Sequence, residues 1–228
     1  MSQSTDIEVK LCGLRSVEDV RAAAAVGANF AGIVLVPGAR RAVTLEVAAA
    51  MVQELASDPC RPIGLVGGAV SSADVRRIVA TTGLRSLQLV GNESQARGLL
   101  HDLGDLELDL HRTLTLPSEL DLQDAAEGWE ARGVRIVFDA AGRVGELGGT
   151  GHRIDADAVR PLLHGTRGLA GGLNPRNVAD IVRDLQPALV DVSSGIEDSA
   201  GVNDPALMAA FVEAARRAAS EPHPEPVP

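Results

Sequence analysis

The sequence predicts an α/β protein built as a single (β/α)8 barrel, the TIM barrel. Apolar runs that suit short strands alternate with amphipathic stretches that suit helices, and eight such pairs fit into the 228 residues. Several runs, such as FAGIVLV and VRIVFD, are nearly continuous in apolar residues, as expected of parallel strands covered on both faces. A doubly wound sheet has the same alternation. No GxGxxG fingerprint follows the first strand, however, so the barrel is preferred.

The elements can be located in order along the chain. The predicted strands lie at residues 7–12, 30–36, 62–67, 86–90, 106–112, 134–139, 167–170 and 188–192. Helices are predicted at residues 17–26, 45–55, 73–81, 93–103, 117–132 and 205–219. Side chains that can cap a first helical turn stand before four of them, at Ser16, Thr44, Ser72 and Asp204. Gly27 and Gly83 stand where two helices should end.

The chain is long enough for one core, and we expect one barrel domain over residues 1–219 with a flexible, proline-rich tail at 220–228. The first residues, MSQSTDIEVK, lack the pattern of a signal peptide, and no apolar run approaches the ~18 residues of a membrane span. Two cysteines do not make a disulfide framework, so a cytoplasmic protein without a membrane partner is expected.

The charge balance argues against a nucleic-acid partner. The net charge is −10 and aromatic residues make up 2% of the chain, whereas a nucleic-acid binder needs a basic face and usually aromatic rings for stacking. A small phosphorylated ligand remains compatible, because backbone N–H groups can hold a phosphate. The scattered histidines indicate no metal site, and nothing marks a hydrophobic subunit interface, so we expect a monomer.

In a barrel the chemistry belongs at the carboxyl ends of the strands. After the seventh predicted strand comes AGGLNP, with Gly171 and Gly172, and after the eighth comes DVSSG, with Ser193, Ser194 and Gly195. Glycines leave backbone amides uncovered and serines add hydroxyl donors, so the two loops together predict a phosphate site. Each loop alone would also suit an ordinary tight turn.

Three further side chains stand at strand ends. Asp139 closes VRIVFD, where apolar surroundings would raise its pKa and suit a general acid; the alternative is an N-cap. Cys12 stands at the end of the first strand. It is either a reactive thiol or a small buried hydrophobic residue, and taken without its neighbours the second interpretation is preferred. Arg40 and Arg41 are either solvated charges or, at a barrel mouth, partners for a carboxylate.

Taken together, these pieces resemble the phosphoribosylanthranilate isomerase family of tryptophan biosynthesis. The matching stretches are VKLCGL with SVEDV, VGANFAGIVLVPGARRAVT, LQLVGNES, GGTG, AGGLNPRNV and DVSSGIEDSAGVNDP, in the family's order over most of the chain. The resemblance implies a (β/α)8 barrel that performs an Amadori rearrangement of N-(5′-phosphoribosyl)anthranilate without a cofactor.

The resemblance also implies residue roles. Cys12 falls on the family's general base, Asp139 on the general acid, and Arg41 on the arginine that meets the anthranilate carboxylate. The glycines and serines of the last two loops fall on the phosphate site. A thiol and a carboxylic acid have ordinary pKa values of ~8.5 and ~3.9, so near neutrality each rests in the wrong form. We therefore expect an apolar wall beside Asp139 and a positive charge beside Cys12.

The chain departs from the family pattern at a few positions on the anthranilate side. Val90 replaces a usual histidine, Gly67 and Gly68 replace part of a phenylalanine-valine-asparagine run, and His152 replaces a common lysine. Two alternatives therefore stay open. One is a barrel enzyme acting on a related sugar phosphate, and the other is a non-catalytic member that binds the phosphorylated ligand.

Overall fold

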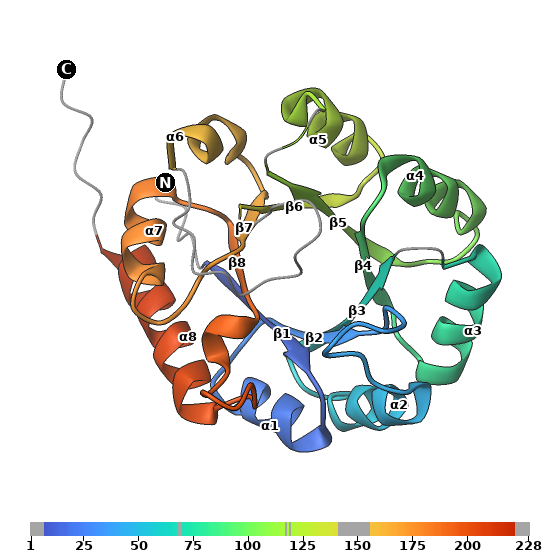
Figure 1. The fold of residues 1–228 in the computed structure, drawn as a ribbon, viewed down its shortest axis with the longest axis horizontal. Helices are drawn as coiled ribbons and strands as arrows, with labels where there is room; N and C mark the ends of the chain where they lie inside the picture. Colours follow the sequence, from blue (N-terminus) through green and yellow to red (C-terminus); the bar gives the residue numbers. More distant parts are fainter. Residues whose placement is uncertain (1–6, 68–69, 117, 119, 141–155, 222–228) are drawn as a thin grey trace.

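A computed structural model describes residues 7–67, 70–116, 118, 120–140 and 156–221. The described residues form a closed barrel of eight parallel strands in chain order, with helices packed around the outside (Figure 1). The strands are β1 Glu8–Leu14, β2 Phe30–Val34, β3 Arg61–Gly67, β4 Ser86–Val90, β5 Asp109–Thr115, β6 Arg135–Asp139, β7 Gly168–Ala170 and β8 Leu189–Val192. The (β/α)8 prediction is confirmed, and every predicted strand has a counterpart.

The helices follow the strands in the order that the sequence predicts. They are α1 Val17–Ala25, α2 Leu45–Glu54, α3 Ser72–Thr82, α4 Glu93–Asp102, α5 Leu122–Glu130, α6 Ala156–Val159, α7 Val178–Leu185 and α8 Pro205–Ser220, with 3-10 turns η1 Arg160–Leu162 and η2 Ser194–Ile196. The helices α6 and α7 were not located from the sequence. No helix among the described residues is long and apolar enough to cross a membrane.

Capping side chains set most helix starts. Ser16, Thr44 and Asp204 each accept a hydrogen bond from a backbone N–H of the first turn, as predicted. The prediction of Ser72 as a cap was wrong by one residue. Ser71 is the cap, because its hydroxyl accepts from the N–H of Asp74 while the Asp74 carboxylate accepts from the N–H of Ser71.

Two predicted boundaries in the middle of the chain were also wrong. The fifth strand was predicted at residues 106–112 but runs over Asp109–Thr115. The apolar alternation of LELDLHRTLTL continues through both ranges, and the strand begins where Asp109 N–H donates to Arg85 O of the neighbouring chain segment at 2.9 Å. The following helix begins only at Leu122, because the Asp121 side chain caps it.

The barrel closes between the first and last strands, and this joint positions the site. Strand β1 pairs with β2 on one side and with β8 on the other, with Lys10 opposite Asp191 and Cys12 opposite Gly32. Apolar side chains fill the layer between strands and helices, and a smaller cluster inside the barrel comprises Phe30, Ile63, Val137, Ala170 and Leu189. The carboxyl ends of all eight strands consequently share one rim.

Candidate active site

Cys12 lies near the carboxyl end of β1, immediately before an irregularity in the strand. The register against β2 shifts between Cys12 and Leu14, and Gly13 between them has φ +81°, which glycine adopts without strain. The Cys12 side chain is buried against β2: a Cβ placed on Gly32 would lie 2.8 Å from the Cys12 Sγ. The absence of a side chain at residue 32 therefore makes the room that the thiol occupies.

Lys10 and Asp191 form a buried ion pair beside this thiol. The Lys10 Nζ lies 2.6 Å from Asp191 Oδ2, and the two side chains are 0% and 7% exposed. Lys10 precedes Cys12 by two residues on the same strand, so both side chains point to the same face. Asp191 Oδ1, the other carboxylate oxygen, is buried and has no hydrogen-bond partner among the described residues.

The electrostatics of this cluster act on Cys12 in opposite directions. Burial and, to a smaller extent, the negative charge of Asp191 raise the pKa of the Cys12 thiol, and Lys10 and Arg41 lower it without offsetting that rise. Burial alone would lower the pKa of Lys10, but the interactions with Asp191 and, after it, with Cys12 outweigh burial, so the pKa of Lys10 is raised and the side chain stays cationic. The expected cation beside the thiol is present, yet the thiol remains the favoured form.

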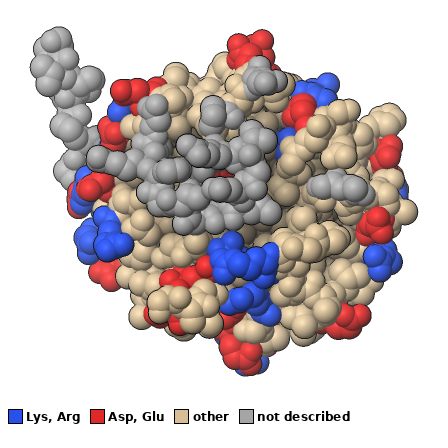
Figure 2. Space-filling view, in the orientation of Figure 1, with Lys and Arg blue, Asp and Glu red and all other residues tan. Residues whose placement is uncertain are grey.

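Arg41 lies over the same corner of the barrel. A Cβ on Gly13 would collide with the Arg41 Cδ, so the arginine stem lies directly on the backbone next to Cys12. Its Nε and Nη2 donate to the two carboxylate oxygens of Glu197 at 2.7 and 3.0 Å. Figure 2 shows a group of basic side chains beside the middle of this face, on the side where β1 and β2 lie in Figure 1.

The loops after β7 and β8 pack directly against each other. A Cβ on Gly195 would collide with the carbonyl oxygen of Leu173, so only glycine permits this close approach. None of the hydrogen bonds between described residues uses the backbone N–H of Gly171, Gly172, Ser194 or Gly195. These amides stand at adjoining strand ends, where an anion can accept from several of them at once.

Ser193 takes a different direction from the rest of its loop. Its hydroxyl oxygen would lie 3.0 Å from a Cβ on Gly13, so the side chain leans toward the end of β1. The structure thus joins the eighth loop both to the seventh loop, through Gly195, and to the Cys12 corner, through Ser193.

Asp139 ends β6 on the other side of the ring from β1 (Figure 1). Its backbone carbonyl accepts from Leu116 N–H at 2.8 Å, and the residue is half-buried at the rim. The glycine-rich loop at residues 142–151 and His152, together with Gly68 and most of the predicted tail at 220–228, lie outside the described residues. The raised pKa expected for Asp139 stays a prediction.

Two of the positions at which the chain departs from the family pattern, Gly67 and Val90, lie side by side on neighbouring strands. Gly67 of β3 is in register with Val90 of β4, and a Cβ on Gly67 would lie 2.5 Å from the Val90 Cγ2. The backbone oxygen of Val90 would be equally close to that Cβ, at 2.5 Å, so this backbone arrangement has no room for a side chain at residue 67. Neither Gly67 nor Val90 supplies a polar side chain at this part of the rim.

Sequence reasoning missed three residues that touch the predicted site. Lys10 carried a signal, since it is a lone cation in an apolar strand two residues before the cysteine. Asp191 was read only as part of the eighth loop, and Glu197 only as part of a matching stretch. Their partners are Lys10 and Arg41, which lie at the other end of the chain.

The sequence model of the family described as N-(5′-phosphoribosyl)anthranilate isomerase matches residues 9–214. The chain belongs to this family. A relative with that name from Cereibacter sphaeroides is 36% identical over 220 residues, which cover 92% of this chain and 99% of the relative. The resemblance seen in the sequence motifs is confirmed.

The barrel of this chain also resembles solved structures of N-(5′-phosphoribosyl)anthranilate isomerases. The crystal structure of TrpF from Jonesia denitrificans superposes with a TM-score of 0.78 at 29% identity, covering 94% of this chain and 98% of that one. A phosphoribosyl anthranilate isomerase crystallised with reduced 1-(o-carboxyphenylamino)-1-deoxyribulose 5-phosphate has a TM-score of 0.74 at 23% identity, covering 92% and 99%. The latter likeness concerns the fold.

Proposed function

We propose that this protein is an N-(5′-phosphoribosyl)anthranilate isomerase of tryptophan biosynthesis. It converts N-(5′-phosphoribosyl)anthranilate into 1-(2-carboxyphenylamino)-1-deoxyribulose 5-phosphate, an aldose–ketose isomerisation by acid–base catalysis. The observation that carries the proposal is the family match over residues 9–214, supported by relatives of that name over nearly their whole length. The buried thiol at the barrel rim supplies a group suited to the chemistry.

In the proposed mechanism Asp139 acts first, as the general acid. It donates a proton to the ring oxygen of the ribose, the bond from that oxygen to C1′ breaks, and the anilino nitrogen lone pair forms an iminium with C1′. The C2′ proton is acidic in this intermediate. Cys12, as thiolate, removes it; the C–H electron pair forms the C1′–C2′ double bond, and the iminium electrons return to nitrogen. The enol-amine then tautomerises to the ketone.

The protein's charges support the base role of Cys12. Burial and the charge of Asp191 disfavour the thiolate, but Lys10 and Arg41 place positive charge beside it, and the iminium adds a further positive charge at the moment of proton transfer. The pair of Lys10 with Asp191 keeps the lysine cationic while holding it against the barrel interior. A thiol that is neutral in the free enzyme can therefore give its proton to solvent once the iminium has formed beside it, and the resulting thiolate then takes the C2′ proton.

The proposed binding contacts lie on either side of the reacting sugar. Arg41 meets the carboxylate of the anthranilate ring through charge-assisted hydrogen bonds. Gly171, Gly172, Ser193, Ser194 and Gly195 hold the phosphate, through backbone amides that have no other acceptor among the described residues and through the serine hydroxyls. The substrate then spans from the β7 and β8 loops to the β2 loop, across the end of β1.

We place the enzyme in the cytoplasm, where a reducing environment keeps Cys12 a free thiol, and propose that it works as a monomer. Both cysteines are free and buried, and neither has a disulfide partner among the described residues. The isomerisation needs neither a redox cofactor nor a second substrate.

The test is a continuous assay of the isomerisation. Phosphoribosylanthranilate is generated in the cuvette, and the decay of its fluorescence is followed with and without the protein. We expect Cys12→Ser and Asp139→Asn each to lower kcat by two or more orders of magnitude, the size of a general acid or base contribution. Cys60→Ala, which removes the other cysteine, is the matched control. A wild-type protein that is folded and leaves the decay unchanged would sink the proposed function.

A further inference from the structure

Arg41 is held on one edge of its guanidinium. Glu197 accepts from Nε at 2.7 Å and from Nη2 at 3.0 Å, and the two side chains are 11% and 6% exposed. This is a two-point contact between a planar fork and a carboxylate, which fixes the guanidinium plane as well as its position.

Among the described residues only Glu197 accepts hydrogen bonds from the Arg41 guanidinium, which leaves a second fork available. A guanidinium has five N–H groups, and Glu197 takes the one on Nε and one of the two on Nη2. The remaining three lie on Nη1 and on the outer side of Nη2, where they can donate to another carboxylate. The stem of Arg41 rests on Gly13, so this fork is held beside the corner that contains Cys12.

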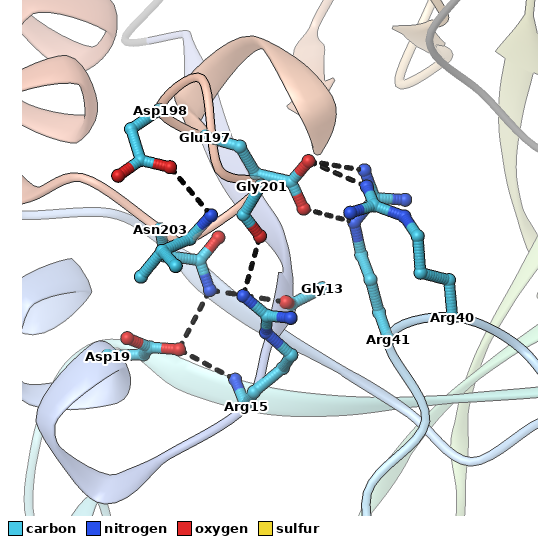
Figure 3. A network of polar contacts seen from close by, with 10 residues as sticks. Gly13, Arg15, Asp19, Arg40, Arg41, Glu197, Asp198, Gly201 and Asn203 are labelled. Atoms are coloured by element: carbon cyan, nitrogen blue, oxygen red, sulfur yellow. Dashed lines mark hydrogen bonds and ion pairs between the residues drawn. The ribbon is translucent and has the colours of Figure 1, made fainter.

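Glu197 itself is fixed in place. Its N–H donates to Ser194 O at 3.2 Å, it forms an isolated antiparallel bridge with Asn203, and Arg40 Nη2 donates to its Oε2 at 2.6 Å (Figure 3). Burial opposes ionisation of Glu197, but the hydrogen bonds from Arg41 and Arg40 outweigh it, so the pKa of Glu197 is lowered. The side chain is thus an ionised, anchored acceptor.

The turn that carries Glu197 is tied to the end of β1. Asn203 Nδ2 donates to Gly13 O at 3.3 Å and to Asp19 Oδ2 at 2.7 Å. Arg15 donates from its backbone N–H to the same Asp19 oxygen at 2.8 Å and from Nη2 to Gly201 O at 2.7 Å (Figure 3). The two surfaces between which Arg41 lies, Gly13 and Glu197, therefore belong to one hydrogen-bonded frame.

The charges of Arg40, Arg41 and Glu197 do not cancel, so this group can bind one more anion. Two arginines against one ionised glutamate carry a net charge of +1, and a ligand carboxylate would neutralise it. Building on the proposed function, we propose that Glu197 is a positioning residue: it holds one edge of Arg41 so that the other edge receives the carboxylate of the substrate. Glu197 does not itself touch the substrate.

The test measures recognition of the carboxylate. The ligands are reduced 1-(o-carboxyphenylamino)-1-deoxyribulose 5-phosphate and the same compound without its carboxyl group, with Kd determined by calorimetry beside KM and kcat. The variants are Glu197→Gln, Arg41→Ala, both together, and Glu54→Gln as the matched control. Glu54 makes a similar two-point contact with Arg21 on the outer helices, at 2.6 and 3.0 Å.

We expect Glu197→Gln to raise KM, and Kd for the carboxylated ligand, about tenfold, because one charge-assisted contact is weakened. Its kcat stays close to that of the wild type, and Kd for the ligand without the carboxyl group is unchanged. In the Arg41→Ala background Glu197→Gln has no further effect, since it acts only through Arg41. Glu54→Gln behaves as the wild type.

Four results would overturn the role of Glu197. Tighter binding by Glu197→Gln would mean that the glutamate competes with the substrate for Arg41. Equal losses for both ligands, or an added loss in the Arg41→Ala background, would mean a general structural role. If Glu197→Gln does not fold, Glu197→Asp carries the test, because its shorter side chain cannot keep both contacts; an unchanged ligand preference in that variant refutes the proposal. An inactive wild type would instead refute the proposed function.

Discussion

Replacing Lys10 with methionine tests how much the buried ion pair between Lys10 and Asp191 contributes to the stability of the protein. The change removes the ammonium group and leaves Asp191, whose side chain is 7% exposed, without its only hydrogen-bond partner among the described residues. Breaking a buried ion pair by removing one partner costs about 3–5 kcal/mol, because the remaining charge is desolvated and uncompensated. The Nζ to Oδ2 distance of 2.6 Å and the full burial of Lys10 place this pair toward the upper end.

The assay is urea unfolding of Lys10→Met, of Asp191→Asn and of the double variant. We expect Lys10→Met to lose about 3–5 kcal/mol of the free energy of unfolding, and the double variant to regain a large part of it, since no unpaired charge remains. A loss below about 1 kcal/mol, or a double variant no more stable than Lys10→Met, would refute the reasoning.

The same pair sets a pH dependence of known sign. The pKa of Lys10 is raised in the folded protein, so the stability it contributes is fully present below its ordinary pKa and is lost as the pH rises through the folded value. In Lys10→Met that alkaline loss should disappear. The lysine also lowers the pKa of Cys12, so alkylation of Cys12 in Lys10→Met should require a higher pH than in the wild type.

Two further predictions concern close packing and the second cysteine. Gly32→Ala would set a Cβ 2.8 Å from the Cys12 Sγ, and we expect it to lower kcat at least tenfold and stability by about 1–3 kcal/mol. In the control variant Gly64→Ala the new Cβ is crowded by Leu84 instead, so only stability should fall. Equal kcat values for the two variants would contradict this prediction. Burial, with the charge of Asp58, raises the pKa of Cys60 to about 12, so stability should fall between pH 9 and pH 12, and less steeply in Cys60→Ala. Chemical denaturation of both proteins across that pH range is the measurement. Identical profiles of stability against pH for the wild type and Cys60→Ala would count against this role of Cys60.

The strands and their order were predictable from the sequence because buried parallel strands leave nearly continuous apolar runs. The strand ends then placed Cys12 and Asp139 at the rim of the barrel, whereas the base role proposed for Cys12 came from the family resemblance and not from its strand end. Local pattern failed for β5, where alternation extends past both boundaries and only pairing with the segment before β4 selects Asp109 as the start.

The partners of the site residues were not predictable in the same way. Whether Lys10 meets Asp191 depends on the register at which β1 pairs with β8, and no local pattern specifies that register. Glu197 reaches Arg41 because η2 and the following turn fold back over the end of β1. Both contacts arise from closure of the ring, whereas the strand ends arise from each strand by itself.

The joint between β1 and β8 also bears on when the enzyme becomes active during synthesis. Lys10 and Asp191 are 181 residues apart, and Gly13 and Asn203 are 190 apart. A ribosome delivers the amino end first, so the strand that carries Cys12 emerges long before the strand that completes its surroundings. Contacts of such sequence separation form late, after most loop-closure entropy has been lost. In the nascent chain Lys10, beside the thiol, consequently lacks its ion-pair partner until the last strand docks, and we expect a chain truncated before β8 to lack activity.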